Sequence, residues 1–116
     1  MDRTELTALA VVGVMIVLDY LTGIIKAAFH HDISSGKMRE GLYHKGAYIL
    51  VMVLAEIVEH AQQVIDLGFA VPIVIPAAVY IVVTEITSIL ENIAAINPSL
   101  AGSPVLKLFR TRDETQ

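Results

Sequence analysis

The stretch LGFAVPIVIPAAVYIVVT, residues 67–84, contains no charged residue over 18 positions. A helix needs about 20 apolar residues to cross the roughly 30 Å hydrocarbon core of a bilayer. A chain of 116 residues has room for one compact unit, which is too small to enclose a helix that is apolar on every side. The stretch therefore predicts a membrane-spanning helix.

Two further apolar segments are long enough to span a membrane only if a few ionisable residues are included in them. Residues 6–18 continue past Asp19 to Lys26, and residues 46–55 continue past Glu56. We predict an all-α integral membrane protein that forms a single domain over 1–116, with three transmembrane helices at about 5–30, 46–66 and 69–95 and a polar tail at 97–116. The second segment has an acidic centre, so a helix that lies in the membrane interface remains an alternative for it.

The two connections between these helices differ in length. Hydrophilic residues 30–45, which include serines and glycines suited to turns, join the first helix to the second. Only a few residues near 66–68 join the second to the third, and so short a connection requires an antiparallel helical hairpin. Pro72 and Pro76 then fall in the first turns of the third helix, where the missing N–H does least harm.

Basic residues indicate which side of the membrane each connection faces. The connection at 66–68 has none, and the N-terminal segment has only Arg3. Cytoplasmic loops are enriched in lysine and arginine, and three spans place the first connection and the tail on one side. We therefore predict a cytoplasmic C-terminus and an external N-terminus. The cytoplasmic basic residues are Lys37, Arg39 and Lys45 in the first connection, and Lys107, Arg110 and Arg112 in the tail.

Each predicted helix carries a polar face, because its polar residues are spaced by three, four or seven positions. These residues are Asp19, Thr22 and Lys26 in the first helix, Glu56, Glu59, His60 and Gln63 in the second, and Glu85, Ser88, Glu91 and Asn92 in the third. One side of every helix thus suits lipid, whereas the other does not. We predict that the polar residues pair between helices or line a pore.

Asp19 has the least favourable position of these residues. A charge in the middle of a spanning helix costs about 2.5–3.5 kcal/mol. Lys26 lies about 10 Å further along the helix and is expected to reach the headgroups, which Asp19 cannot do. Asp19 must therefore be protonated, paired with another helix, or wet. Because intramembrane carboxylates outnumber the cations, we expect several chains to share the polar faces, and Gly23 and Ala27 would allow close helix contact.

Several classes of function are disfavoured. The chain has no cysteine, which excludes disulfides and thiol chemistry. It has no basic patch with interleaved aromatic residues, so nucleic acid is not an expected partner. The sequence EIVEH at 56–60 has glutamate where the inverted zinc-protease pattern H-x-x-E-H requires histidine. We predict no enzyme, no catalytic residue, no cofactor and no metal.

Three segments together resemble bacteriophage holins: DYLTGIIKA at 19–27, SSGKMREGLYHKG at 34–46 and TEITSILEN at 84–92. The most similar type includes clostridial toxin-secretion holins and is often labelled by a phage of pneumococcus. The resemblance extends from about residue 15 to 95. It implies a protein that forms homo-oligomers in the bacterial cytoplasmic membrane. At a set time such a protein opens lesions that release an endolysin or a toxin, without implying direct binding to either.

Two other functions also fit the polar faces. Intramembrane carboxylates serve proton relays, so a small ion- or proton-conducting transport protein is the main alternative. A structural accessory subunit that binds a different chain through its polar faces is the third possibility. The size of the solutes that pass separates the three, because a relay is selective, a lesion passes large solutes and an accessory subunit passes none.

Overall fold

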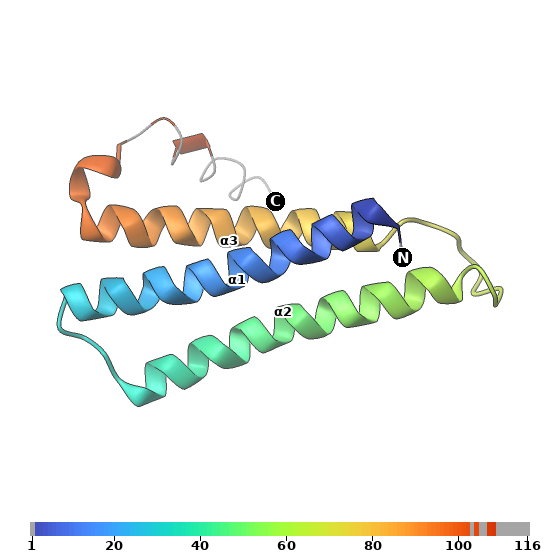
Figure 1. The fold of residues 1–116 in the computed structure, drawn as a ribbon, viewed down its shortest axis with the longest axis horizontal. Helices are drawn as coiled ribbons and strands as arrows, with labels where there is room; N and C mark the ends of the chain where they lie inside the picture. The colour runs from blue at the N-terminus through green and yellow to red at the C-terminus, as the bar shows by residue number, and fades with distance from the viewer. Residues whose placement is uncertain (1, 103, 105–106, 109–116) are drawn as a thin grey trace.

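The protein is a narrow bundle of three helices. A computed structural model describes residues 2–102, 104 and 107–108. It contains α1 (Arg3–Phe29), α2 (Ser35–Ala61), α3 (Val74–Ile96) and a short 3-10 helix, η1 (Pro98–Leu100). The chain runs along the bundle in α1, returns in α2 and runs forward again in α3, so that α1 and α3 are parallel (Figure 1). α1 packs mainly against α3.

Within the described part of the chain, three helices are long and apolar enough to cross a membrane. The 27 residues of α1 and of α2 extend over about 40 Å, and the 23 residues of α3 over about 35 Å. All three exceed the roughly 30 Å of a hydrocarbon core. The predictions of an all-helical fold and of three spans are confirmed to this extent.

α2 begins at Ser35 and not near residue 46, so the predicted boundary was wrong. Ser34 is in an extended conformation, and its side chain accepts a hydrogen bond of 3.1 Å from the backbone N–H of Lys37. This serine therefore acts as an N-cap, which starts a helix, rather than as a turn residue. The connection between α1 and α2 therefore covers only residues 30–34. Most of the hydrophilic connection predicted at 30–45 belongs to α2.

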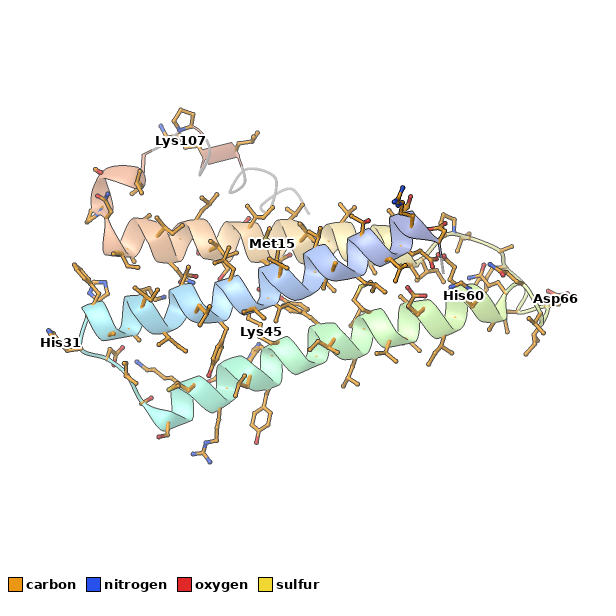
Figure 2. The ribbon with its side chains drawn as sticks, viewed as in Figure 1. Met15, His31, Lys45, His60, Asp66 and Lys107 are labelled. Atoms are coloured by element: carbon orange, nitrogen blue, oxygen red, sulfur yellow. The ribbon has the colours of Figure 1, made fainter. Side chains whose placement is uncertain are left out.

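The connection between α2 and α3 is longer than the sequence predicted. α2 ends at Ala61 and α3 begins at Val74, so the connection covers 62–73. Gly68 has a φ of 84°, a value that favours glycine, and its N–H donates to Asp66 Oδ1 at 2.9 Å. Pro72 consequently precedes α3. His31 and Asp66 mark the two connections at opposite ends of the bundle (Figure 2).

α2 supplies the cap for the beginning of α3. Ile73, the N-cap residue of α3, makes no side-chain cap bond. In its place Glu59 Oε1 accepts hydrogen bonds from the N–H groups of Ile73 at 2.5 Å and Val74 at 2.9 Å. Gln62 Oε1 accepts from the N–H of Val71 at 2.7 Å. The start of a helix leaves backbone donors without intrahelical partners, and Glu59 of α2 satisfies two of them here.

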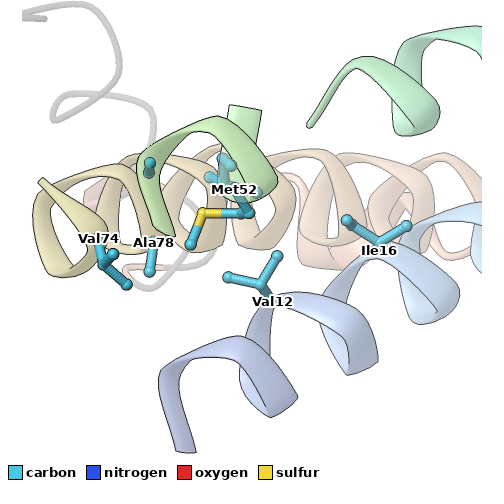
Figure 3. Packing of buried hydrophobic residues seen from close by; sticks show 7 residues of the cluster. Val12, Ile16, Met52, Val74 and Ala78 are labelled. Atoms are coloured by element: carbon cyan, nitrogen blue, oxygen red, sulfur yellow. The ribbon is translucent and has the colours of Figure 1, made fainter. Parts of the chain in front are cut away.

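The bundle has apolar residues both at its centre and over its outer surface. Its buried apolar core consists of Val12, Ile16, Met52, Ala55, Val74, Ala78 and Ile81 (Figure 3). Large apolar side chains such as Val14, Leu50 and Ile57 are more than half exposed. The buried polar residues are Glu5, Asp19, Thr22, Glu85, Thr87 and Asn92. An apolar exterior around buried polar groups suits a protein surrounded by lipid.

Candidate functional site

One group of polar residues joins all three helices, and Lys45 of α2 lies at its centre. The Lys45 ammonium forms an ion pair with Asp19 of α1, and its Nζ lies 2.9 Å from both carboxylate oxygens of Glu85 of α3. The side chain of Lys45 is only 16% exposed, that of Asp19 5% and that of Glu85 1%. Figure 2 shows Lys45 between α2 and α1. One ammonium is thus shared by two buried carboxylates.

Asp19 also receives hydrogen bonds from α3. Ser88 Oγ donates to Asp19 Oδ1 at 2.7 Å, and Asn92 Nδ2 donates to the same oxygen at 3.1 Å. Asn92 Nδ2 also donates to Thr22 Oγ1 at 3.0 Å, and that hydroxyl donates to the backbone carbonyl of Asp19. Both carboxylate oxygens of Asp19 therefore have partners on another helix, as buried polar groups require. We call Asp19, Thr22, Lys45, Glu85, Ser88 and Asn92 the three-helix cluster.

The three helices reach this cluster at the same level. Asp19 lies ten residues before the end of α1, Lys45 ten residues after the start of α2, and Glu85 eleven residues before the end of α3. At 1.5 Å per residue, these positions are about 15–17 Å from the ends of their helices. The cluster therefore lies well inside the bundle, where an unpaired charge would be most costly.

Lys45 was predicted among the cytoplasmic basic residues, and the structure places it inside the bundle instead. The sequence does contain a signal for this position. Lys45 lies eleven residues before Glu56, a spacing that returns to nearly the same face of a helix. The polar face of the second helix therefore continues upstream of residue 46, and following it would have added Lys45 to the intramembrane residues.

The other predicted basic residues lie elsewhere. Lys37 and Arg39 are exposed near the start of α2, and Lys107 is also exposed. Lys37 donates a hydrogen bond to Asp32, and this bond together with the lysine charge holds the pKa of the Asp32 carboxyl below its ordinary value. Arg110 and Arg112 are outside the described residues.

Lys26 lies apart from the three-helix cluster, although it shares a helix with Asp19. Together with Gly23 and Ala27 it lines an open cavity of about 420 Å³ that extends to the three-helix cluster, whose members Asp19, Lys45, Ser88 and Asn92 also line it. The Lys26 ammonium makes no hydrogen bond or ion pair with any residue that the structure describes. A Cβ added to Gly23 would lie 3.7 Å from Asn92 Nδ2, which places this glycine at the contact between α1 and α3.

A second polar group lies at the opposite end of the bundle. His60 Nε2 of α2 is 3.1 Å from Glu56 Oε2 on the same helix and 3.3 Å from Glu5 Oε2 on α1. Glu59 faces the beginning of α3, which it caps. The polar face predicted for the second helix thus brings Glu56, Glu59 and His60 to one end of the bundle. Glu5 was not among the predicted polar residues, although it lies fourteen residues before Asp19 on nearly the same face of α1.

Besides Lys26, two other residues of the predicted polar faces lie outside both groups. Gln63 follows the end of α2 and is exposed. Glu91 is in α3 but is also exposed, because a turn of 100° separates it from the buried Asn92. Among the described residues, the structure therefore gathers most of the predicted polar residues into two groups and leaves Lys26, Gln63 and Glu91 apart.

Comparison with known proteins identifies one family. A family model described as "Bacteriophage holin family" matches residues 5–107. This range includes α1 except its first two residues, all of α2 and α3, the three-helix cluster and the polar group at the opposite end. No curated protein matches the chain, and no solved structure matches it.

Proposed function

The chain belongs to the bacteriophage holin family, and we propose that it opens lesions in the bacterial cytoplasmic membrane through which an endolysin or an exported toxin leaves the cell. Three candidate spans within a matched range of 5–107 make it a multi-pass membrane protein. The family consists of membrane lysis proteins and not of enzymes. In the proposed function many copies of the chain assemble into a homo-oligomer, and the passenger needs no direct contact with them.

The strongest support for this function is the three-helix cluster. Replacing a buried ion pair by apolar residues of similar size is often neutral or stabilising, so a stable bundle does not require one. The cluster is satisfied here by partners within one chain. If α2 parted from α1 and α3, water or other copies could satisfy the same groups. The polar faces would then be paired with one another in the closed state and in contact with water or other copies in the wet state. A switch requires two such states.

The proposed orientation places the connection at 30–34 and the tail in the cytoplasm. Lys45 no longer counts toward this orientation, because it lies inside the bundle. Lys37 and Arg39 are near the start of α2 and still favour this orientation. The basic residues of the tail, Lys107, Arg110 and Arg112, favour the same orientation. The connection at 62–73 contains no lysine or arginine, so the positive-inside rule favours the external side for it.

Cysteine labelling tests this orientation, because the natural chain contains no cysteine. Val64 is 86% exposed in the connection between α2 and α3, and Ile33 is 53% exposed in the connection between α1 and α2. We expect a membrane-impermeant maleimide to label Val64→Cys in intact spheroplasts. Ile33→Cys should be labelled only after the membrane is permeabilised. The reverse pattern would show that the N-terminus is cytoplasmic, and equal labelling of both would show that one helix does not span.

Release of solutes of graded size tests the proposed function directly. We expect the purified chain to release both small and protein-sized fluorescent solutes from liposomes once its density in the membrane is high. Expressed in bacteria together with a cytoplasmic endolysin, it should cause abrupt lysis, whereas either protein expressed alone should not clear the culture. These results would follow from lesions wide enough for a folded enzyme.

The alternatives give different results in the same experiments. Release of protons or small ions without larger solutes would indicate a transport protein and would contradict the lesion. Absence of any release, together with normal insertion, would indicate an accessory subunit. The three-helix cluster suits a proton path less well than a switch, because the carboxylates of Asp19 and Glu85 are both engaged by Lys45.

A further inference from the structure

The polar group at the opposite end from the three-helix cluster has the composition of a metal site. One carboxylate oxygen from Glu5, one from Glu56 and a ring nitrogen of His60 all lie within 4.8 Å of one another. Glu56 and His60 are four residues apart on α2, so both project from one face. Glu5 comes from the first turn of α1 and completes a set of three ligands that the sequence of α2 alone lacks.

The separations of these atoms are those of ligands around one ion, although His60 Nε2 and Glu5 Oε2 are also close enough, at 3.3 Å, for a hydrogen bond. Two ligands about 2.1 Å from a tetrahedral zinc ion are about 3.4 Å apart. His60 Nε2 lies 3.3 Å from Glu5 Oε2 and 3.1 Å from Glu56 Oε2. One ring nitrogen therefore faces two carboxylates, although it carries at most one proton to share between them.

Glu56 gives an independent indication of a missing ligand. Both of its carboxylate oxygens are buried, and neither has a hydrogen-bond partner among the described residues. Its contact with His60 is close, but it does not have the geometry of a hydrogen bond. Apart from this contact, the Glu56 carboxylate, whose side chain is 16% exposed, accepts no hydrogen bond from any residue that the structure describes, and coordination of a cation would satisfy it. Glu59 does not fill this role, because its Oε1 accepts the N–H groups of Ile73 and Val74.

We propose that Glu5, Glu56 and His60 bind one divalent cation of the zinc type and thereby link α1 to α2. A set of one imidazole and two carboxylates suits Zn²⁺ and related first-row ions, whereas Ca²⁺ and Mg²⁺ prefer oxygen ligands alone. A water molecule would complete a four-coordinate site. Glu5 and His60 are close to the ends of their helices, so an ion reaches the site from the aqueous side of the membrane.

Titration of the full chain with zinc tests this site. The protein is purified in detergent without a polyhistidine tag, and Zn²⁺ binding is measured by calorimetry. The visible absorption of bound Co²⁺ reports the coordination geometry. We expect one Zn²⁺ per chain, a tetrahedral Co²⁺ spectrum, a higher melting temperature with Zn²⁺, and no comparable effect of Ca²⁺. Removing a residue that only holds a metal ligand in place typically weakens metal binding 10–100-fold. Because His60 and Glu5 are proposed as ligands themselves, His60→Gln and Glu5→Gln should each weaken Zn²⁺ binding by at least about 100-fold.

The chain offers a matched control on the same helix. Glu40 and His44 form another pair four residues apart on α2, but both are exposed and their closest contact is 3.9 Å. His44→Gln should leave zinc binding unchanged. Binding that persists in His60→Gln would overturn the proposal, and so would a wild-type chain that does not bind. Binding that is lost in His60→Gln but retained in Glu5→Gln would overturn the link between α1 and α2. Circular dichroism of each variant verifies that the helices are intact.

Discussion

Replacing Lys45 by methionine should lower the free energy of unfolding of the bundle by about 3–5 kcal/mol. Methionine fills a similar space but removes the one ammonium that Asp19 and Glu85 share, so two carboxylates remain buried without a cation. The cost comes from those carboxylates and not from a lost apolar contact. Thermal unfolding in detergent micelles and the amount of protein that accumulates in the membrane both measure it.

Two further variants separate this explanation from a general sensitivity of α2. Lys37→Met removes a lysine near the start of the same helix, but the side chains of Lys37 and its partner Asp32 are both 63% exposed. Because exposed ion pairs contribute little, this variant should unfold like the wild type. The triple change Lys45→Met, Asp19→Asn and Glu85→Gln removes the carboxylates as well and should recover most of the lost stability. Failure of the triple variant to recover would show that the charge imbalance is not the cause.

Asp19→Leu should abolish lysis or delay it strongly in cells that also express an endolysin. The change leaves the half-buried Ser88 without its acceptor, which costs about 1–3 kcal/mol, whereas Asn92 loses one acceptor and keeps Thr22 Oγ1. Lys45 and Glu85 remain as a balanced pair, so the chain should still insert and accumulate. The expected defect therefore lies in the change between the closed and the wet states. Lysis time at matched protein levels measures it.

Asp19→Asn is the matched variant for this prediction. Its side-chain oxygen can still accept from Ser88 and Asn92, while the negative charge is lost. We expect a shift in lysis time that is smaller than the effect of leucine, because the closed packing is kept. Wild-type timing in Asp19→Leu at equal protein levels would show that the three-helix cluster plays no part in opening.

The sequence is sufficient for the class of fold, because uncharged runs and regular polar spacing are local properties. Residues 67–84 alone indicate a span, and the spacing from Asp19 to Lys26 indicates a polar face. The boundaries are harder to predict, since they depend on interactions that composition does not show. α2 starts early because the hydroxyl of Ser34 caps it. α3 starts late because Glu59, from another helix, caps it at Val74.

The partners within the site were less predictable than its members. Helical spacing places Asp19, Glu85, Ser88 and Asn92 on polar faces, but it does not say which helices are neighbours or at what level they meet. Lys45 was missed because the glycines and serines before it resemble a turn. Glu5 was missed because a residue in the first turn of a helix looks like a solvated end, and only the packing of α1 beside α2 brings it to His60.

Lys45 also restricts how the helices can move against one another. A single ammonium that contacts both α1 and α3 fixes the axial register of all three helices at once. Sliding any of them by one turn, about 5.4 Å, would separate the Lys45 Nζ from carboxylate oxygens that now lie within hydrogen-bonding distance. Piston-like motion along the membrane normal is therefore opposed from the first step. We expect the helices to separate sideways, with α2 swinging out of the bundle while the depth of each helix in the bilayer stays constant.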